Sequence, residues 1–245
     1  DTFSSVSLPS GGRLNRVATS SNRSSIPLIY SAVTQNLGFT VSADEGKTEA
    51  LASYADYGRE TQIYKALSES FYIGDAFQIE HSPSSSFPIE HVANQWHEMQ
   101  EWIRSLRINE SDEGIAAGIQ QFFEDFMVGY LSAVKSRFST RFLAVAGGGF
   151  ANVTLNRRIF EDGIFEDIYI FPAMGDDGAA LGALLEGAVS TGRDVDWLRD
   201  VDMPYFGPSE TESLVEQAIA DVADRVNVEM VGDAFPVTDA GAAGQ

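Results

Sequence analysis

The stretch that decides the fold runs from Phe142 to Ala188 and reads FLAVAGGGFANVTLNRRIFEDGIFEDIYIFPAMGDDGAALGALLEGA. The short apolar runs at 142–146 and 168–171 are typical of buried parallel strands. Each run leads into a glycine-containing turn and then a helical pattern, over 151–161 and 178–190. Two successive strand–glycine–helix units predict an α/β sheet with right-handed crossovers.

Helical spacing of apolar residues dominates the chain upstream of this stretch. We expect helices over 26–38, 44–54, 60–72, 91–107 and 113–137, and loop structure over the Ser/Pro-rich residues 74–90. Residues 1–25 favour an edge strand plus loop. Downstream, the sequence predicts a connection over 192–209, a helix over 210–224 and a strand over 226–231. The polar, unpatterned ends lead us to expect a piece of a longer protein.

The composition limits the classes of function. The 245 residues carry a formal charge of −20, with 36 acidic against 16 basic side chains, and no cysteine. Such a field repels nucleic acid and anionic lipid, and the absence of thiols excludes disulfides and fits a cytoplasmic location. The dispersed acidic excess favours a halophilic protein, with an ordinary acidic protein as the alternative. No apolar run is long enough to span a bilayer.

The first candidate site is the turn AVAGGGFAN, Ala144 to Asn152. Glycines at the end of a strand let a phosphate or ribose approach the backbone, and the N-terminus of the next helix favours an anion. Asn152 is placed to hydrogen-bond a sugar or a base. A tight turn with a capping asparagine is the alternative.

The second candidate site is the loop PAMGDDG, Pro172 to Gly178. Asp177 is expected to cap the following helix, which leaves Asp176 facing the cleft at the carboxyl end of the strand. A carboxylate beside a nucleotide usually holds a metal ion. In the alternative, both aspartates cap or solvate the turn. The small residues of the helix are expected to let it lie close on the sheet.

A third group of charges, Asp44, Glu45 and Lys47, crowds around Gly46. Lys47 can pair with a phosphate or a carboxylate, whereas a solvated helix start is the alternative. The three histidines, His81, His91 and His97, do not have the spacing of a metal site on one helix face.

These segments, in this order, resemble the carbamoyltransferase family, which includes nodulation-factor and antibiotic O-carbamoyltransferases. The resemblance runs from about residue 25 to 208 through SIPLIYSAVTQNLGF, EGK, GIQQFFEDF, LAVAGGGFANVTLNRRI and FPAMGDDGAALGALL. It implies an ASKHA fold (actin, Hsp70 and sugar kinases; RNase H-like), partial and with helical insertions, closest to the tRNA threonylcarbamoyladenosine enzymes. By this resemblance, residues 1–140 form the C-terminal part of the first ASKHA half with a helical insertion, and 141–208 form the core of the second. Residues 209–245 then lead to a YrdC-like domain outside the chain.

The resemblance also implies a chemistry, in which ATP and carbamoyl phosphate give a carbamoyl-adenylate and a small-molecule hydroxyl accepts the carbamoyl group. It assigns residues to the nucleotide, namely Asp44, Glu45, Lys47, Gly58, Gly147, Gly148 and Asn152. It assigns Asp176 to a divalent metal, either Fe, Mg or Mn.

The family's catalytic histidine pair is expected upstream of residue 1, so the isolated chain is expected to be inactive. The local sequence Gly149–Phe150 departs from the small apolar residues of the family. A tRNA-modifying enzyme and a non-catalytic nucleotide-binding scaffold remain the alternative functions, and the net charge argues against a tRNA partner.

Overall fold

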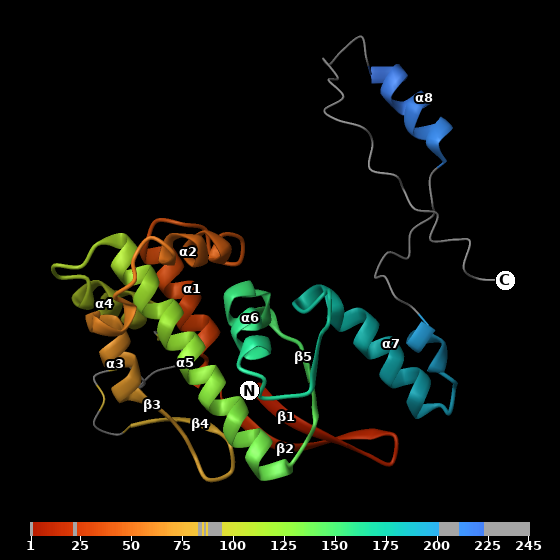
Figure 1. Cartoon of the computed structure of the whole chain (residues 1–245), viewed down its shortest axis with the longest axis horizontal. Coiled ribbons are helices and arrows are strands. Elements are labelled where there is room, and N and C mark those ends of the chain that lie inside the picture. The colour runs from red at the N-terminus through yellow and green to blue at the C-terminus, as the bar shows by residue number, and fades with distance from the viewer. Residues whose placement is uncertain are drawn as a thin grey trace. The chain divides into compact units, whose positions relative to one another are not determined.

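Figure 1 shows the chain as a computed structural model, which describes residues 2–21, 24–82, 85, 87, 95–200 and 211–222. The chain divides into two compact units, residues 1–195 and 196–245. Within the second unit, the described residues form the 3-10 helix η5 (Asp196–Asp200) and the helix α8 (Glu212–Val222). The strand predicted over 226–231 lies outside the described residues. The core and the predicted site residues lie in the first unit.

All five helices predicted in the first part of the chain form, with ends shifted by a few residues. They are α1 (Ile26–Asn36), α2 (Glu45–Ala52), α3 (Gln62–Ser70), α4 (Gln95–Leu106) and α5 (Asp112–Phe138), with the 3-10 turn η2 (Gly58–Glu60) before α3. Side chains fix several of their starts. Ser25 caps α1 by accepting a hydrogen bond from the Leu28 N–H, and Ser111 caps α5 by accepting from the Gly114 N–H.

The two predicted strand–glycine–helix units also form. Strands β5 (Phe142–Val145) and β6 (Asp167–Ile170) pair in parallel and are connected through α6 (Val153–Glu161), and α7 (Ala179–Ser190) follows β6. The prediction of buried strands is wrong, because Phe142 and Tyr169 are each 60% exposed. The prediction that α7 packs closely on the sheet is also wrong, since none of its residues is buried. A two-stranded sheet offers little surface on which a helix can pack.

Two antiparallel hairpins contain strands that the sequence analysis did not predict. Residues 1–25, expected to hold one edge strand, form β1 (Thr2–Ser10) and β2 (Arg13–Ser21) around Gly11 and Gly12, both at positive φ. The expected loop over 74–90 contains β4 (Ile79–His81), which pairs with β3 (Phe71–Ile73). The adjoining Ser/Pro-rich run concealed a strand of only three residues.

The core surrounds α5, which runs the length of the helical layer in Figure 1. Ile115, Ile119, Phe122 and Phe123 of α5 are almost fully buried. The face predicted for 91–107 is confirmed where it is described: Met99, Trp102 and Ile103 are buried, and Trp96 and Leu106 pack against the same cluster. Val92 lies outside the described residues. Leu155, Ile159 and Phe165 join this core, so residues on both sides of position 140 share one apolar cluster.

Two glycines allow η2 and α3 to approach α5 closely. A Cβ added at Gly58 lies 2.5 Å from the carbonyl oxygen of Ala117. One added at Gly118 lies 2.3 Å from Thr61 Oγ1, which caps α3 and donates to the Gly58 carbonyl. Gly58 therefore has a packing role here, which leaves its predicted contact with a nucleotide as a prediction.

An ion-pair network fastens α6 to α5 and η2. Asp125 accepts two hydrogen bonds of 2.8 Å from Arg59 and one of 2.9 Å from Tyr64, and it forms a 2.7 Å ion pair with Arg158. Burial raises the pKa of Asp125, but the hydrogen bonds from Arg59, Arg158 and Tyr64 outweigh it and lower the pKa to about 2.

Gly118→Ala is expected to destabilise the protein by about 1–3 kcal/mol, because the new methyl group overlaps the Thr61 and Ile63 side chains. Gly129→Ala, in the same helix, is the matched control. Its Cβ meets nothing within 4 Å, so better helix propensity should stabilise by up to about 1 kcal/mol. Urea denaturation followed by circular dichroism gives both values, and equal effects at the two positions are inconsistent with the close approach.

Asp125→Asn is expected to lower the free energy of unfolding at pH 7 by roughly 1.5–3 kcal/mol, the range for hydrogen bonds to charged groups. The folded pKa of about 2 lies below the ordinary 3.8, so Asp125 stabilises above pH 4 and this stabilisation is lost as the pH falls toward 2. Urea midpoints between pH 7 and pH 2 should therefore change less in the variant than in wild type. Asp75→Asn, at an exposed position, should behave as wild type.

Candidate functional site at the carboxyl ends of β5 and β6

The two glycine turns lie side by side where the parallel strands end. The Phe171 N–H donates to the Val145 carbonyl at 3.2 Å, and the Gly147 N–H donates to the Met174 carbonyl at 2.6 Å. These hydrogen bonds extend the pairing of β5 and β6 beyond the strands and hold the first turn against the second. The structure thus brings together the segments that carry Gly147, Gly148 and Asp176.

Backbone is accessible at this junction. A Cβ added at Gly147, Gly148 or Gly175 meets nothing within 4 Å, and Gly147 has a φ of +112° that favours glycine. Among the described residues, no acceptor pairs with the N–H groups of Gly148 and Gly149. Gly149 lies against α1, since its added Cβ is 3.0 Å from Pro27 Cγ. The turn therefore presents two successive donors, with open space beside Gly148, an arrangement suited to an anion.

Asn152 has a structural function in this fold. It is 8% exposed, caps α6 by accepting from the Leu155 N–H at 2.8 Å, and exchanges two hydrogen bonds with Gln120, at 2.8 and 3.1 Å. Gln120 also accepts from the Tyr30 hydroxyl and donates to Glu124. Burial, followed by the nearby carboxylates, raises the pKa of Tyr30 well above its usual range, which keeps the hydroxyl protonated as a donor. The predicted contact of Asn152 with a nucleotide stays a prediction.

Glu49 occupies the N-terminus of α6, which the sequence favoured as a place for an anionic ligand. Its carboxylate accepts from the Thr154 N–H at 2.6 Å, next to the Leu155 N–H that Asn152 caps. The helix dipole and the exposed donors are thus matched by a carboxylate of the protein itself. Sequence reasoning missed Glu49, because 105 residues separate it from Thr154 and no local pattern marks the pair.

Asp176 lies exposed in the 3-10 turn η4 (Asp176–Gly178), directly after the junction. The prediction that Asp177 caps α7 is wrong: Gly178 occupies the cap position, and no side chain makes the capping hydrogen bond. The turn inserted before α7 brings Gly178 so close to Ala173 that an added Cβ lies 2.2 Å from its carbonyl oxygen. Within the described part of the chain, no group of three or more candidate ligands surrounds a metal position. Asp176 alone does not make a metal site, and its metal role stays a prediction.

The charged side chains of the third motif all have partners within the protein. Lys47 Nζ lies 2.8 Å from Asp44 Oδ1, and the Thr40 N–H donates to the same carboxylate at 3.0 Å. The hydrogen bond from Lys47 lowers the pKa of Asp44. Glu45 accepts from the Ser31 hydroxyl at 2.7 Å and from the Ser42 N–H at 2.8 Å. The hydrogen bonds of these three residues organise the start of α2, and Glu49 of the same helix reaches the first turn of α6.

Comparison with known proteins shows the family to which this chain is related. The family model described as Carbamoyltransferase N-terminus matches residues 4–185. An uncharacterized protein of Methanocaldococcus jannaschii is 40% identical over 215 residues, which are 86% of this chain and 34% of that protein. Nodulation protein NolNO of Sinorhizobium fredii is 25% identical over 93% of this chain and 32% of its own length. Nodulation protein NolO of Bradyrhizobium diazoefficiens is 26% identical over 83% of this chain and 35% of its own length. The chain thus spans about a third of each of these relatives.

None of the helices in the described ranges is both long enough and apolar enough to cross a bilayer.

Asn152→Ala is expected to destabilise the protein by about 2–4 kcal/mol, since it removes the cap of α6 and both hydrogen bonds between Asn152 and the buried amide of Gln120. Thermal and urea denaturation measure the change, with Asn15→Ala on an exposed strand position as the control. A variant as stable as wild type contradicts the structural role of Asn152.

Proposed function

The chain belongs to the carbamoyltransferase N-terminus family, and we propose that it provides the nucleotide-binding part of an enzyme that transfers a carbamoyl group to a hydroxyl of a small molecule. The donor is carbamoyl phosphate, activated with ATP as a carbamoyl-adenylate. One observation supports this proposal above the others. The Gly147 N–H of the first glycine turn donates to the Met174 carbonyl of the second at 2.6 Å. Among the described residues, the N–H groups of Gly148 and Gly149 have no acceptor, and there is open space beside Gly148.

The proposed chemistry is an acyl-type transfer. The acceptor oxygen attacks the carbamoyl carbon, a new C–O bond forms, and the bond from that carbon to the adenylate phosphate oxygen breaks, so that AMP leaves with the electron pair. The leaving phosphate carries negative charge, which the Gly148 and Gly149 N–H groups are positioned to stabilise. The Gly147 N–H is already bonded to Met174 and so contributes to the shape of the turn.

Three other residues near the glycine turns have supporting functions in the proposed site. Asn152 and Glu49 hold α6 in place, and Asp176 is the candidate for contacting a nucleotide-bound cation at the edge of the junction. A cation bound with the nucleotide would neutralise phosphate charge. The base that takes the acceptor proton is expected in the histidine pair that the family resemblance places upstream of the chain.

Calorimetric titration with ATP, with and without Mg²⁺ or Mn²⁺, tests the nucleotide site. Gly148→Val places a branched side chain where the phosphate approaches, and it should weaken ATP binding by at least tenfold, about 1.4 kcal/mol. Asp176→Ala should reduce the difference in affinity between titrations with and without metal. Asp177→Ala, at the adjacent exposed carboxylate, should leave that difference unchanged. Metal-independent binding in wild type, or equal effects of the two aspartate variants, rejects the role of Asp176.

The transfer itself is tested with the full-length protein, carbamoyl phosphate, ATP and a panel of hydroxyl acceptors. The expected products are a carbamate ester and AMP, observed by mass spectrometry, with a strong loss of both in Gly148→Val. Binding of tRNA at the working salt concentration, without carbamate formation, favours the tRNA-modifying alternative. ATP binding with no carbamoyl transfer to any acceptor favours the alternative of a non-catalytic nucleotide-binding scaffold.

A further inference from the structure

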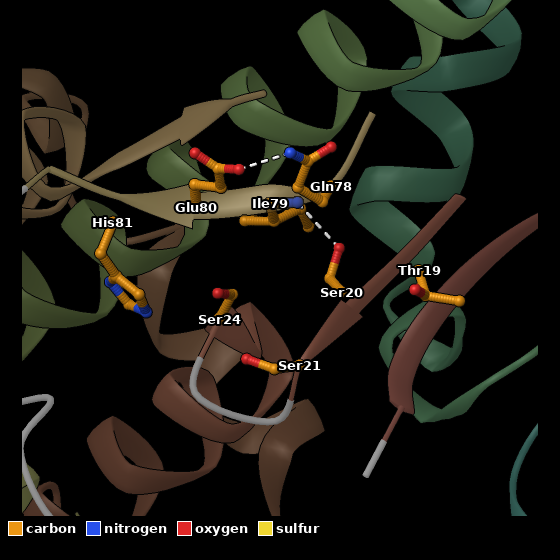
Figure 2. Close-up of a pocket in the computed structure, with 8 residues that line it drawn as sticks. All are labelled: Thr19, Ser20, Ser21, Ser24, Gln78, Ile79, Glu80 and His81. Atoms are coloured by element: carbon orange, nitrogen blue, oxygen red, sulfur yellow. Dashed lines mark hydrogen bonds between the residues drawn. The ribbon is translucent and has the colours of Figure 1, made fainter. Parts of the chain in front are cut away.

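A second concave region lies away from the glycine turns in sequence, between the end of β2, the residues that precede α1, and β4. It has a volume of about 400 Å³, within the range of small-molecule sites. Its described lining residues are Thr19, Ser20, Ser21, Ser24, Gln78, Ile79, Glu80 and His81. All of them except Ile79 carry a hydroxyl or another polar group, although apolar atoms contribute more of the pocket surface than polar atoms. Figure 2 shows Ser20, Ser21 and Ser24 grouped opposite β4, with His81 at the end of that strand.

The serine hydroxyls of the pocket can still form hydrogen bonds with a ligand. Ser20 Oγ accepts from the Ile79 N–H at 2.8 Å, which ties β2 to β4 and leaves the hydroxyl hydrogen of Ser20 to donate. Ser24 is only 5% exposed, and its side chain has no hydrogen-bond partner in the part of the chain that the structure describes. In Figure 2 its hydroxyl lies in the space below β4. The Ser24 oxygen keeps some contact with solvent, so its hydroxyl can both donate to and accept from a polar ligand.

One wall of the pocket is held by aromatic contacts. The His81 ring lies 4.5 Å from the Phe71 ring and stacks on Phe87 at 5.3 Å with an interplanar angle of 12°. Phe71 and Phe87 belong to the main core, so the imidazole is positioned by buried side chains. A fixed wall reduces the ordering cost of binding.

The charge of the residues that line this pocket disfavours an anionic ligand. Glu80 accepts from the Tyr72 hydroxyl at 2.6 Å and from Gln78, and the hydrogen bond from Tyr72 lowers its pKa, so the carboxylate stays ionised. No lysine or arginine is among the described residues that line the pocket. A phosphate or carboxylate there meets a negative charge with no opposing cation in that lining. Hydroxyls, which both donate and accept, match the serines, the amide and the carboxylate together.

We propose that this pocket binds an uncharged, polyhydroxylated small molecule of monosaccharide size. The ligand's hydroxyls pair with Ser20, Ser21 and Ser24 on one side and with the β4 edge on the other. The assignment goes beyond carbamoyl transfer and does not depend on it, because it rests only on the geometry between β2 and β4.

Saturation-transfer NMR on the full-length protein tests the proposal, with D-glucose, D-galactose and myo-inositol as probes and calorimetry for the affinity of any that bind. At least one probe is expected to bind, and Ser24→Ala should weaken its binding about 3- to 10-fold through the loss of one hydrogen bond. Ser21→Ala, at a more exposed position, should weaken it less. Ser10→Ala, on the exposed hairpin tip, is the matched control and should bind as wild type.

Three results overturn the proposal. The first is no saturation transfer to any of the three probes, and the second is binding that Ser24→Ala leaves unchanged. The third is preferential binding of inorganic phosphate or of glucosamine that Ser24→Ala weakens, which identifies an ion site instead. Circular dichroism of Ser24→Ala confirms that lost binding reflects the missing hydroxyl, and Ser21→Ala provides a second measurement if that variant is unfolded.

Discussion

The reciprocal amide pair between Gln120 and Asn152 is the interaction on which the rest of the unit depends. It joins the longest helix to the first turn of α6, and through that turn it fixes the glycine segment at the end of β5. Both amides are buried, so each needs the other, and the Tyr30 hydroxyl and the Glu124 carboxylate complete the set. A polar network that is fully satisfied specifies one arrangement of the packed elements, whereas an apolar contact alone permits sliding.

Several charged side chains near this site already have partners within the protein, which limits the places where a ligand can bind. Glu49 accepts a hydrogen bond at the N-terminus of α6. At the start of α2, Asp44 pairs with Lys47, and Glu45 accepts from Ser31. The remaining backbone donors of the described turn are the N–H groups of Gly148 and Gly149, with open space beside Gly148. Under the proposed function, main-chain groups rather than charged side chains would carry most of the ligand contacts at this end of β5 and β6, in keeping with a segment rich in glycine.

Local patterns in the sequence predicted the helices well, because the period of apolar residues and the capping serines act within a few positions. The parallel pairing of β5 with β6 also followed from the order of strands, glycines and helices. Three features could not be predicted. The Glu49–Thr154 contact links distant positions, the short strand β4 is hidden beside a Ser/Pro-rich run, and the exposure of Phe142 depends on how much sheet is present. The family resemblance found the glycine turns, but it could not show that the Asn152 side chain is used within the fold.

The exposed apolar side chains of β5, β6 and α7 have a consequence for the behaviour of the protein in solution. Phe142, Tyr169 and Leu184 expose most of their apolar surface on a molecule of formal charge −20. Added electrolyte screens the mutual repulsion of the molecules, and strongly excluded anions such as sulfate also strengthen apolar contact. Both effects bring such faces together, so colloidal stability should decline with sulfate sooner than with chloride at equal ionic strength.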